Sequence, residues 1–429
     1  MQFKILRAGR KSKFQVVHIE PADQKPEGIV LSQQPGCKHA GLCGGCRARH
    51  LDYQFQWEWK SRPIRQKMQE KYGLEPRLLA APDLAHFRNR MDYAVEGTKI
   101  GLRPPQDFQT VLDLEECPVL RQPGEEILKI FRTLLVRHPS LGRDRENETG
   151  WLKYVTIRLG KRAGVIVLTT SGQKEGISNF LLDLEKALSD LTTTKGFPLS
   201  LVETVTEDKQ ELSCTPGGTA LIGRPDYRDE LAGQTFDVPY DSFFQPNPDA
   251  FGLLLDTFLE LSEPYFLEAQ GAETGWKSGD NPKAGTLVDL YCGAGILSQI
   301  VARRWPFFGK IKGYEFVQSA VDQAMRLFSE SEVQASFEAV DLNQPGNLEL
   351  NSDLLIADPP RAGLSPALCQ EIAHTKPAKY MIYISCNPET QLRDLEILSQ
   401  SYIPRTAILA DCFPYTSHME QAILLTAQS

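Results

Sequence analysis

Apolar and polar positions follow two different patterns along the chain. From residue 286 onward, short runs of branched and aromatic residues stand between longer stretches with helical spacing. Residues 286–291, 354–357 and 380–384 are such runs, and each predicts a buried strand that is followed by a turn. Alternating strands and helices are typical of a doubly wound parallel sheet. We therefore predict an α/β fold with a Rossmann-like sheet for the C-terminal part.

The first half of the chain has a mixed pattern, which predicts an α+β domain. Amphipathic stretches predict helices at residues 51–72, 125–136 and 178–191. Strands are predicted at 86–103, 108–114, 154–159, 164–170 and 199–222, and 154–159 pairs with 164–170 as a hairpin.

These patterns divide the chain into three parts. Residues 1–36 form a basic N-terminal extension with a short hairpin, and residues 37–235 form the central α+β domain. Residues 236–429 form the C-terminal domain, in which the Gly-rich stretch 267–285 predicts a loop.

The net charge argues against a protein that coats nucleic acid, and the lack of long apolar runs argues against a membrane protein. The 429 residues include 47 Lys and Arg against 55 Asp and Glu, a net charge of −8. Residues 37–103 nevertheless carry 13 Lys and Arg against 7 Asp and Glu, which fits a local surface for a phosphate backbone or a solvated face. No apolar run is long enough to span a membrane, and residues 1–13 lack the apolar core of a signal peptide. We expect a cytoplasmic protein.

Three of the nine cysteines stand close together. Cys37, Cys43 and Cys46 have the spacing C-x5-C-x2-C, and Cys117 is followed by proline, as in some iron–sulfur ligands. A closed site needs four ligands, so Cys117 completes an iron–sulfur site, or His39 or His50 completes a zinc site. Both kinds of metal site remain open at this point.

A glycine turn in the C-terminal domain predicts a nucleoside pocket. Residues 292–295 read Cys-Gly-Ala-Gly between a strand and a helix, and Glu315 ends the next strand, where an acid suits two ribose hydroxyls. The P-loop lysine and the third glycine of the dinucleotide fingerprint are absent, so an adenosine ligand without phosphates fits better. This favours S-adenosylmethionine. Asp341 and Asp358, each at the end of a predicted strand, are further candidate contacts.

Cys386 directly follows the strand at residues 380–384 and Ser385, and Asn-Pro then forces a turn into a helix. A thiol at the carboxyl end of a strand lies where α/β sheets hold their ligands, and the helix N-terminus would favour its thiolate. The alternative is a buried, inert cysteine. We interpret Cys386 as a nucleophile.

With these motifs, the chain from Cys37 onward resembles the RNA uracil-5-methyltransferase family. The motifs are Phe-Phe-Gln-Pro-Asn at 243–247, Asp-Leu-Tyr-Cys-Gly at 289–293, Asp-Pro-Pro-Arg-Ala-Gly at 358–363, Ser-Cys-Asn-Pro at 385–388 and His-Met-Glu at 418–420. The four-cysteine pattern resembles the branch that carries a [4Fe-4S] cluster and modifies 23S ribosomal RNA. The barrel-like RNA-binding domain that some members carry at the N-terminus is not expected, since 36 residues are too few for it.

The resemblance implies a role for each site residue. Cys386 adds to C6 of a uridine flipped out of its stack, so that C5 becomes nucleophilic, and Glu420 removes the C5 proton. The implied contacts of S-adenosylmethionine are Gln245, Tyr291, Glu315 and Asp358, with Asp341 as a fifth candidate. Cys37, Cys43, Cys46 and Cys117 hold the cluster, with zinc as the alternative metal.

The implied partner is 23S rRNA or a ribosomal precursor, and a monomer is expected. Two other functions compete with this one. An amine methyltransferase could use the Asp-Pro-Pro motif and would need no thiol, and a non-catalytic ribosome-binding factor would bind RNA without transferring methyl groups.

Overall fold

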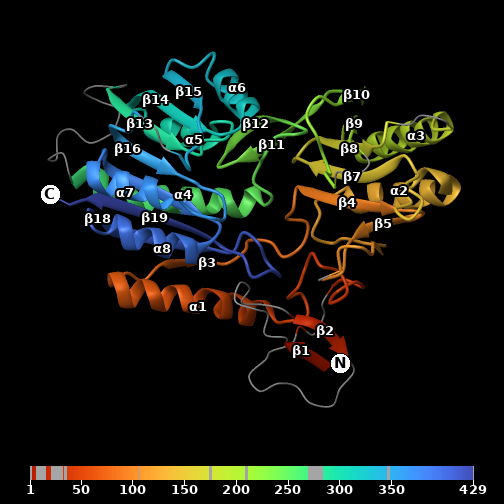
Figure 1. The fold of residues 1–429 in the computed structure, drawn as a ribbon, viewed down its shortest axis with the longest axis horizontal. Helices are drawn as coiled ribbons and strands as arrows, with labels where there is room; N and C mark the ends of the chain where they lie inside the picture. The colour runs from red at the N-terminus through yellow and green to blue at the C-terminus, as the bar shows by residue number, and fades with distance from the viewer. Residues whose placement is uncertain are drawn as a thin grey trace. The chain divides into compact units, whose positions relative to one another are not determined.

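The C-terminal part of the chain forms one large sheet, as the alternation of strands and helices predicts (Figure 1). The computed structural model describes residues 2–5, 16–20, 32, 36–105, 107–172, 176–207, 211–268, 284–344 and 348–428. Within them the sheet has the order β15-β14-β13-β16-β17-β19-β18-β3. Its strands are β13 (Gly285–Leu290), β14 (Phe308–Glu315), β15 (Gln334–Ala339), β16 (Ser352–Ala357), β17 (Ala378–Ser385), β18 (Tyr402–Ala410), β19 (Glu420–Ala427) and β3 (Arg77–Leu79).

The direction of the strands fixes where a ligand can bind. Strands β13 to β17 run parallel to one another, whereas β19 is antiparallel to both β17 and β18. Strand β13 has β14 on one side and β16 on the other, so the strand order reverses at β13. Open α/β sheets bind ligands beyond the carboxyl ends of their strands at such a reversal. The connecting helices are α4 (Pro248–Glu268), α5 (Ile296–Arg304), α6 (Gln318–Leu327), α7 (Pro366–Thr375) and α8 (Pro388–Leu398).

Two elements from early in the chain belong to this sheet's compact unit. The C-terminal unit comprises Trp57–Ala81, Ala250–Cys412 and His418–Ser429, and thus includes most of α1 (Tyr53–Tyr72) as well as β3. Strand β3 pairs in parallel with β18, and the buried ammonium of Lys60 donates to Asp411 Oδ1 at 2.7 Å. The sequence pattern instead predicts that residues 51–72 belong to the central domain. Neither a three-residue strand nor an ion pair that spans 351 positions leaves a sequence pattern.

The N-terminal unit comprises Met1–Gln56, Pro82–Asp249 and Phe413–Ser417, and it contains a second sheet of order β10-β9-β8-β7-β4-β5-β6. All neighbours in it are antiparallel except β8 and β9. Its strands are β4 (Arg90–Glu96), β5 (Lys99–Leu102), β6 (Leu112–Asp113), β7 (Leu152–Leu159), β8 (Gly164–Thr170), β9 (Leu199–Val205) and β10 (Thr219–Ile222). Its helices are α2 (Gly124–Arg137), α3 (Ser178–Lys195) and the 3-10 turn η1 (Pro139–Leu141).

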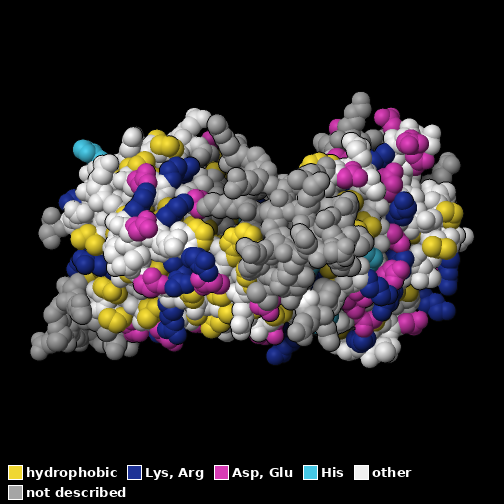
Figure 2. All heavy atoms as spheres, turned by 90° about the horizontal axis from the view of Figure 1, so that it is seen from below, with side chains coloured by type: hydrophobic (Ala, Val, Ile, Leu, Met, Phe, Trp, Pro, Cys, Tyr) yellow, Lys and Arg dark blue, Asp and Glu magenta, His cyan; other side chains and the backbone are white. Residues whose placement is uncertain are grey.

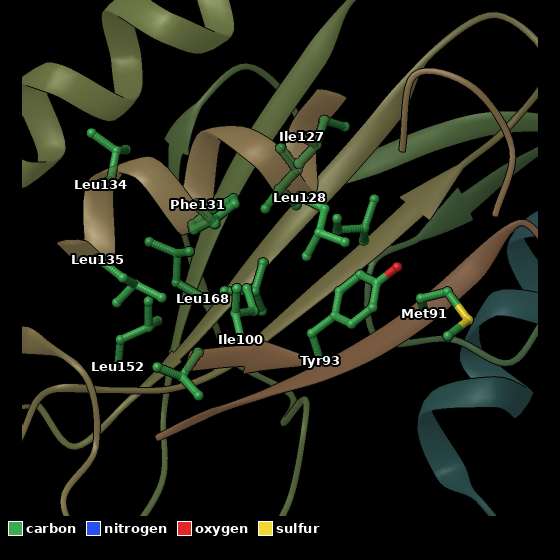
Figure 3. Close-up of a cluster of buried hydrophobic side chains, with 14 of the residues drawn as sticks. Met91, Tyr93, Ile100, Ile127, Leu128, Phe131, Leu134, Leu135, Leu152 and Leu168 are labelled. Carbon is green, nitrogen blue, oxygen red and sulfur yellow. The ribbon is translucent and has the colours of Figure 1, made fainter. Parts of the chain in front are cut away.

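The core of the N-terminal unit lies between this sheet and its helices. Figure 3 shows the apolar side of α2 directed at side chains from β4, β5, β7 and β8. These side chains are Ile127, Leu128, Phe131, Leu134 and Leu135 on the helix and Tyr93, Ile100, Leu152 and Leu168 on the strands. The helix therefore forms where its apolar positions recur at a spacing of three or four residues.

Some predicted elements differ in their bounds. The predicted strand 86–103 is a hairpin, because Gly97 takes a left-handed φ of 56° between β4 and β5. The predicted strand 199–222 is the two strands β9 and β10. Strand β11 (Asp226–Leu231), which was not predicted, pairs with β12 (Gln234–Pro239).

The predicted N-terminal hairpin and the predicted loop at residues 267–285 agree in part with the structure. Strands β1 (Gln2–Ile5) and β2 (Val16–Glu20) pair antiparallel, in agreement with a short N-terminal hairpin. Helix α4 extends to Glu268, and the rest of the predicted loop up to residue 283 lies outside the described residues. No helix in the described part of the chain combines the length and the apolar character that a membrane span requires.

Candidate active site

Four of the predicted site residues end or directly follow parallel strands at the carboxyl edge of the C-terminal sheet. Leu290 pairs with both Tyr314 and Ala357, so the next residues, Tyr291, Glu315 and Asp358, emerge at the same edge. Ala357 pairs in turn with Tyr383 in β17. Cys386 follows the end of that strand. The parallel register thus gathers residues that are up to 95 positions apart in sequence, from Tyr291 to Cys386.

The antiparallel pair β17 and β19 brings the two proposed catalytic residues together. Ser385 pairs with Gln421, so that Cys386 and Glu420 are the next pair in the same register. Glu420 is only 3% exposed, which differs from the exposed position that its residue type alone would suggest. A buried carboxylate beside a half-buried thiol is an arrangement suited to proton transfer next to a nucleophile.

Burial and charge repulsion dominate the electrostatics of this edge. Burial, reinforced by Glu420 and Asp358, raises the pKa of the Cys386 thiol to about 12, while the Arg361 guanidinium lowers it. Burial raises the pKa of Asp358 to about 7, and burial together with Asp358 raises the pKa of Glu420 well above its ordinary value. In the free site, burial beside two carboxyls outweighs any stabilisation of the Cys386 thiolate by the helix N-terminus.

The first turn of α8 holds the loop that carries Arg361. The Arg361 carbonyl accepts hydrogen bonds from Asn387 Nδ2 at 3.0 Å and from Thr390 Oγ1 at 3.2 Å. Asn387 directly follows Cys386, so one short segment both presents the thiol and fixes the backbone of the neighbouring arginine. The sequence motifs singled out both segments without revealing that they are bonded to each other.

A second anchor of the same loop is the buried carboxylate of Asp394. Its Oδ2 accepts the Tyr383 hydroxyl at 2.5 Å and the Leu364 amide at 2.9 Å. Arg393 donates to Oδ1 of this carboxylate and to the carbonyls of Ala362 and Leu364. Sequence reasoning missed Asp394, because a helical aspartate gives no signal until the fold shows it fully buried.

The glycine turn after β13 and the end of β14 are hydrogen-bonded to each other where the nucleoside pocket is predicted. Glu315 accepts the amide of Gly293 on Oε2 at 3.1 Å, and on Oε1 those of Phe316 at 2.8 Å and Val317 at 3.0 Å. These three amides fix the carboxylate at the edge of the sheet. Tyr291 takes a left-handed φ of 62°, a conformation that is uncommon for a tyrosine and typical of functional sites.

Asp289 is a site residue that sequence reasoning did not single out. It is fully buried, Ser298 Oγ donates to its Oδ2 at 2.5 Å, and burial raises its pKa to about 7. Its Oδ1 and the Tyr291 hydroxyl are buried without a hydrogen-bond partner within the described residues. Buried polar atoms of this kind suit a polar ligand. A carboxylate inside an otherwise apolar strand was the available signal.

The remaining two predicted cofactor contacts differ in their surroundings. Asp341 follows β15, and its Oδ1 accepts the amide of Asn343 at 2.9 Å, so that it stabilises a turn at the same edge. Gln245 belongs to the N-terminal unit, where its carbonyl accepts Asn89 Nδ2 at 3.0 Å.

The four predicted metal ligands line one cavity in the N-terminal unit. Its lining includes Cys37, Cys43, Cys46 and Cys117, and the cavity has a volume of about 40 Å³. Burial raises the pKa of Cys43 to about 12 and that of Cys46 to about 11, and the other nearby thiols add to both shifts. Thiolates that repel one another in this way are stabilised by a metal.

Four cysteine side chains around one cavity therefore fit a metal by their chemistry. Among the described residues, no group of three or more His, Cys, Asp or Glu side chains has the spacing of metal ligands. Four sulfur atoms suit an iron–sulfur cluster or zinc. His39 also lines the cavity, but its Nε2 accepts the amide of Glu115 at 3.0 Å. His50 is not among the residues that line it.

Comparisons with known proteins point to one family. A model described as tRNA (uracil-5-)-methyltransferase matches residues 276–428. An uncharacterized RNA methyltransferase of Leptospira interrogans is 32% identical over 402 residues, which cover 91% of this chain and 83% of the relative. The tRNA (uracil(54)-C(5))-methyltransferase of Pyrococcus horikoshii is 27% identical, with 97% of this chain and 89% of the relative covered.

A solved structure extends the similarity to the fold. The crystal structure of the Pyrococcus abyssi tRNA (uracil-54, C5)-methyltransferase in complex with S-adenosyl-L-homocysteine matches with a TM-score of 0.68 and 26% identity. The match covers 90% of this chain and 86% of that structure, so it includes parts of both compact units.

Proposed function

The chain belongs to the RNA uracil-5-methyltransferase family, and on that premise we propose that Cys386 and Glu420 carry out its S-adenosylmethionine-dependent methylation of uracil C5 in RNA. The observation that carries this proposal is the strand register that makes Cys386 and the buried Glu420 neighbours at the carboxyl edge of the sheet. A family match alone would not require these two side chains to meet.

The reaction needs a nucleophile because uracil C5 does not attack an alkyl carbon readily. The Cys386 thiolate adds to C6, and the electrons of the C5–C6 double bond move onto the ring carbonyl, so that C5 becomes nucleophilic. When bound, S-adenosylmethionine would supply the methyl group that C5 takes, with the S–CH3 bond breaking and S-adenosylhomocysteine leaving. Glu420 then removes the C5 proton, the double bond forms again, and the Cys386 sulfur leaves as thiolate.

The order of these steps follows from the charges. Cys386 and Glu420 each raise the cost of ionising the other, so the site favours one anion at a time. When the thiolate bonds to C6, its charge moves into the ring and away from the sulfur. The carboxyl group of Glu420 can then ionise more easily, and its carboxylate acts as the base. Arg361, which lowers the pKa of both groups, stabilises whichever anion is present.

The pocket residues have matching roles toward the cofactor. Glu315 would bind the ribose hydroxyls, because its carboxylate is fixed by three backbone amides. Tyr291, Asp358 and Asp341 would bind the rest of the adenosyl group, with Asp289 as a buried acceptor behind them. Gln245 is proposed as a further contact on the strength of its motif.

Two variants test the catalytic assignment. Cys386→Ala should abolish methyl transfer while RNA binding persists, and Cys214→Ala, which removes another half-buried thiol, should retain transfer. Glu420→Gln should accumulate a protein–RNA adduct that survives denaturing electrophoresis, because the C5 proton then remains in place. Turnover by Cys386→Ala, or only free RNA with Glu420→Gln, would contradict the roles proposed.

For the substrate we propose a uridine in 23S rRNA, on the basis of the four-cysteine motif. The relatives of known activity from Pyrococcus support a second candidate, the uridine at position 54 of tRNA, because they cover 90–97% of this chain. Methyl transfer to purified 23S rRNA and to unmodified tRNA, followed by mass mapping of 5-methyluridine, distinguishes the two. Transfer to tRNA alone would overturn the ribosomal proposal and leave the chemistry intact.

We also propose that Cys37, Cys43, Cys46 and Cys117 hold a [4Fe-4S] cluster. The support is the single cavity that the four sulfurs line, together with the high cost of leaving these thiols ionised without a metal. Four cysteine ligands would close the cluster, which favours a structural or RNA-contact role over redox chemistry. Zinc in the same site is the alternative.

A further inference from the structure

A cluster of arginines in the N-terminal unit converges on one carboxylate. Glu211 accepts hydrogen bonds from Arg103 Nη2 at 2.8 Å, from Arg143 Nη1 at 2.7 Å and from Arg145 Nη2 at 3.2 Å. The Tyr154 hydroxyl donates to the same carboxylate. Residues from three separate segments thus supply four donors to two oxygens.

The donors of this cluster are held more firmly than the acceptor. The side chains of Arg103, Arg143 and Arg145 are 23%, 13% and 19% exposed, whereas Glu211 is 43% exposed. Arg103 also donates to the Tyr154 hydroxyl at 3.0 Å, and Arg145 also pairs with Glu96 at 3.2 Å. The guanidinium groups therefore form a preset anion site, and Glu211 covers it from the solvent side.

The Glu211 carboxylate that the arginine cluster already binds indicates which ligand the cluster would select. A carboxylate and an RNA phosphodiester have the same charge of about −1 and two terminal oxygens for parallel N–H donors. Hydrogen bonds from Tyr154, Arg103 and Arg143 lower the pKa of Glu211 to about 2. Glu211 therefore occupies the cluster as an anion, as a phosphodiester would.

An exposed aromatic ring adjoins the cluster. Phe108 is 74% exposed, and Arg145 Nη1 donates to the carbonyls of Phe108 and Gln109 at 3.3 and 3.4 Å. The turn is set by Asp107, whose carboxylate accepts the amides of Gln109 and Thr110. A solvent-exposed ring on a hydrogen-bonded turn beside cations is an arrangement that can bind unpaired bases.

We propose that Arg103, Arg143, Arg145 and Phe108 form a binding site for single-stranded RNA. In this site a phosphodiester displaces the Glu211 carboxylate and a base stacks on Phe108. The proposal rests on the proposed function, since it assigns a second contact for the RNA substrate outside the catalytic edge. It commits to RNA because a lone anion would leave the exposed ring without a role.

The site also accounts for the mixed charge of the surface. Among the described side chains on the face in Figure 2, Lys and Arg are interspersed with Asp and Glu. In the cluster, the three arginines face Glu211, Glu96 and Asp107, so the free protein is locally neutral. One phosphodiester in place of Glu211 would meet the same three guanidinium groups. An acidic protein can in this way hold RNA without a strongly basic surface.

The test measures the affinity of a labelled single-stranded RNA dodecamer by fluorescence anisotropy across a salt series. The double variant R103A/R145A should bind at least tenfold more weakly, and the slope of log K against log salt should fall by about 0.7, the value for one lost phosphate contact. Arg228→Ala removes an equally paired arginine of the same unit and should leave both quantities unchanged. R103K/R145K keeps the charge and should keep the slope.

Two further variants separate stacking and displacement from a structural role. Phe108→Ala should weaken binding roughly 5- to 150-fold, without a change in salt slope, whereas Leu182→Ala, 63% exposed on α3, should not. Glu211→Gln should tighten binding, because it removes the competing anion. A merely structural Glu211 predicts equal or weaker binding.

The proposal is overturned if R103A/R145A binds like Arg228→Ala, or if Glu211→Gln fails to tighten binding. These readings need no turnover, so they can be repeated with Cys386→Ala in the same chain. If the wild type transfers no methyl group to any RNA, the proposed function fails while the anisotropy still reports on this site.

Discussion

Gly363 lies where the loop after β16 passes the buried carboxylate of Asp394, and it offers a sharp test of how that loop is held. Its φ is +78°, and a Cβ atom added there would lie 2.5 Å from Asp394 Oδ2 and 2.8 Å from Arg393 Nη2. Asp394 Oδ2 cannot retreat without loosening its bonds to Tyr383 and Leu364. Gly363→Ala therefore adds a steric conflict to a backbone conformation that disfavours alanine.

The expected cost has two parts. A left-handed conformation costs a non-glycine residue about 1–2 kcal/mol, and losing one hydrogen bond to a charged group costs about 1.5–3 kcal/mol. We expect Gly363→Ala to lower the free energy of unfolding by about 2.5–5 kcal/mol. Gly73 is the matched control in the same unit, because its φ is +63° and no atom lies within 4 Å of an added Cβ. Gly73→Ala should lose only the first part.

Urea unfolding of both variants measures the difference, and methyl-transfer kinetics measure its effect on the site. Because the loop carries Asp358 and Arg361, we expect kcat to fall at least tenfold in Gly363→Ala and to stay unchanged in Gly73→Ala. Equal losses of stability in the two variants would refute the argument that Asp394 is fixed. Full activity in Gly363→Ala would show that the loop does not position the site.

Other consequences follow from the charges and the sulfurs. With the pKa of Cys386 at about 12 in the free site, kcat/KM should rise with pH from 7 to 9 without a plateau, and a plateau by pH 8 would contradict the raised pKa. The pKa of Glu211 is about 2 when folded against an ordinary 4.5, so its stabilising effect is complete above pH 4.5 and is lost as the pH falls towards 2. The gap in urea midpoint between wild type and Glu211→Gln should therefore close over that range, and a constant gap would argue against it. Cys117→Ala should remove iron, acid-labile sulfide and visible absorbance from the purified protein, whereas Cys214→Ala should keep them. Zinc without iron in the wild type would exclude the cluster.

The sequence revealed most of the C-terminal sheet because parallel strands that are buried on both faces consist of unbroken apolar runs. It also located Cys386, because a thiol at the end of such a run is unusual. Strand β3 escaped prediction, since three residues carry no periodicity. The burial of Glu420 depends on pairing between β17 and β19, and only the resemblance to the family distinguished it from a surface glutamate.

Contacts between distant segments account for what sequence reasoning could not supply. The Arg103 and Glu211 pair joins residues 108 positions apart, and the Asp394 anchor depends on a loop 30 positions earlier. No local sequence pattern predicts such contacts between distant side chains. The raised pKa of Cys386 is of the same kind, because it results from burial and from carboxyls that other strands contribute.

The ion pair of Lys60 and Asp411 has a consequence for the nascent chain. Lys60 leaves the ribosome 351 residues ahead of its partner, an interval of roughly 20–70 s at ordinary elongation rates. The Lys60 side chain, which is buried in the folded protein, must stay hydrated until Asp411 is synthesised. Strand β3 likewise cannot pair until β18 is synthesised. The C-terminal sheet can therefore close only near the end of translation, and a chain released early would lack both Glu420 and a partner for Lys60.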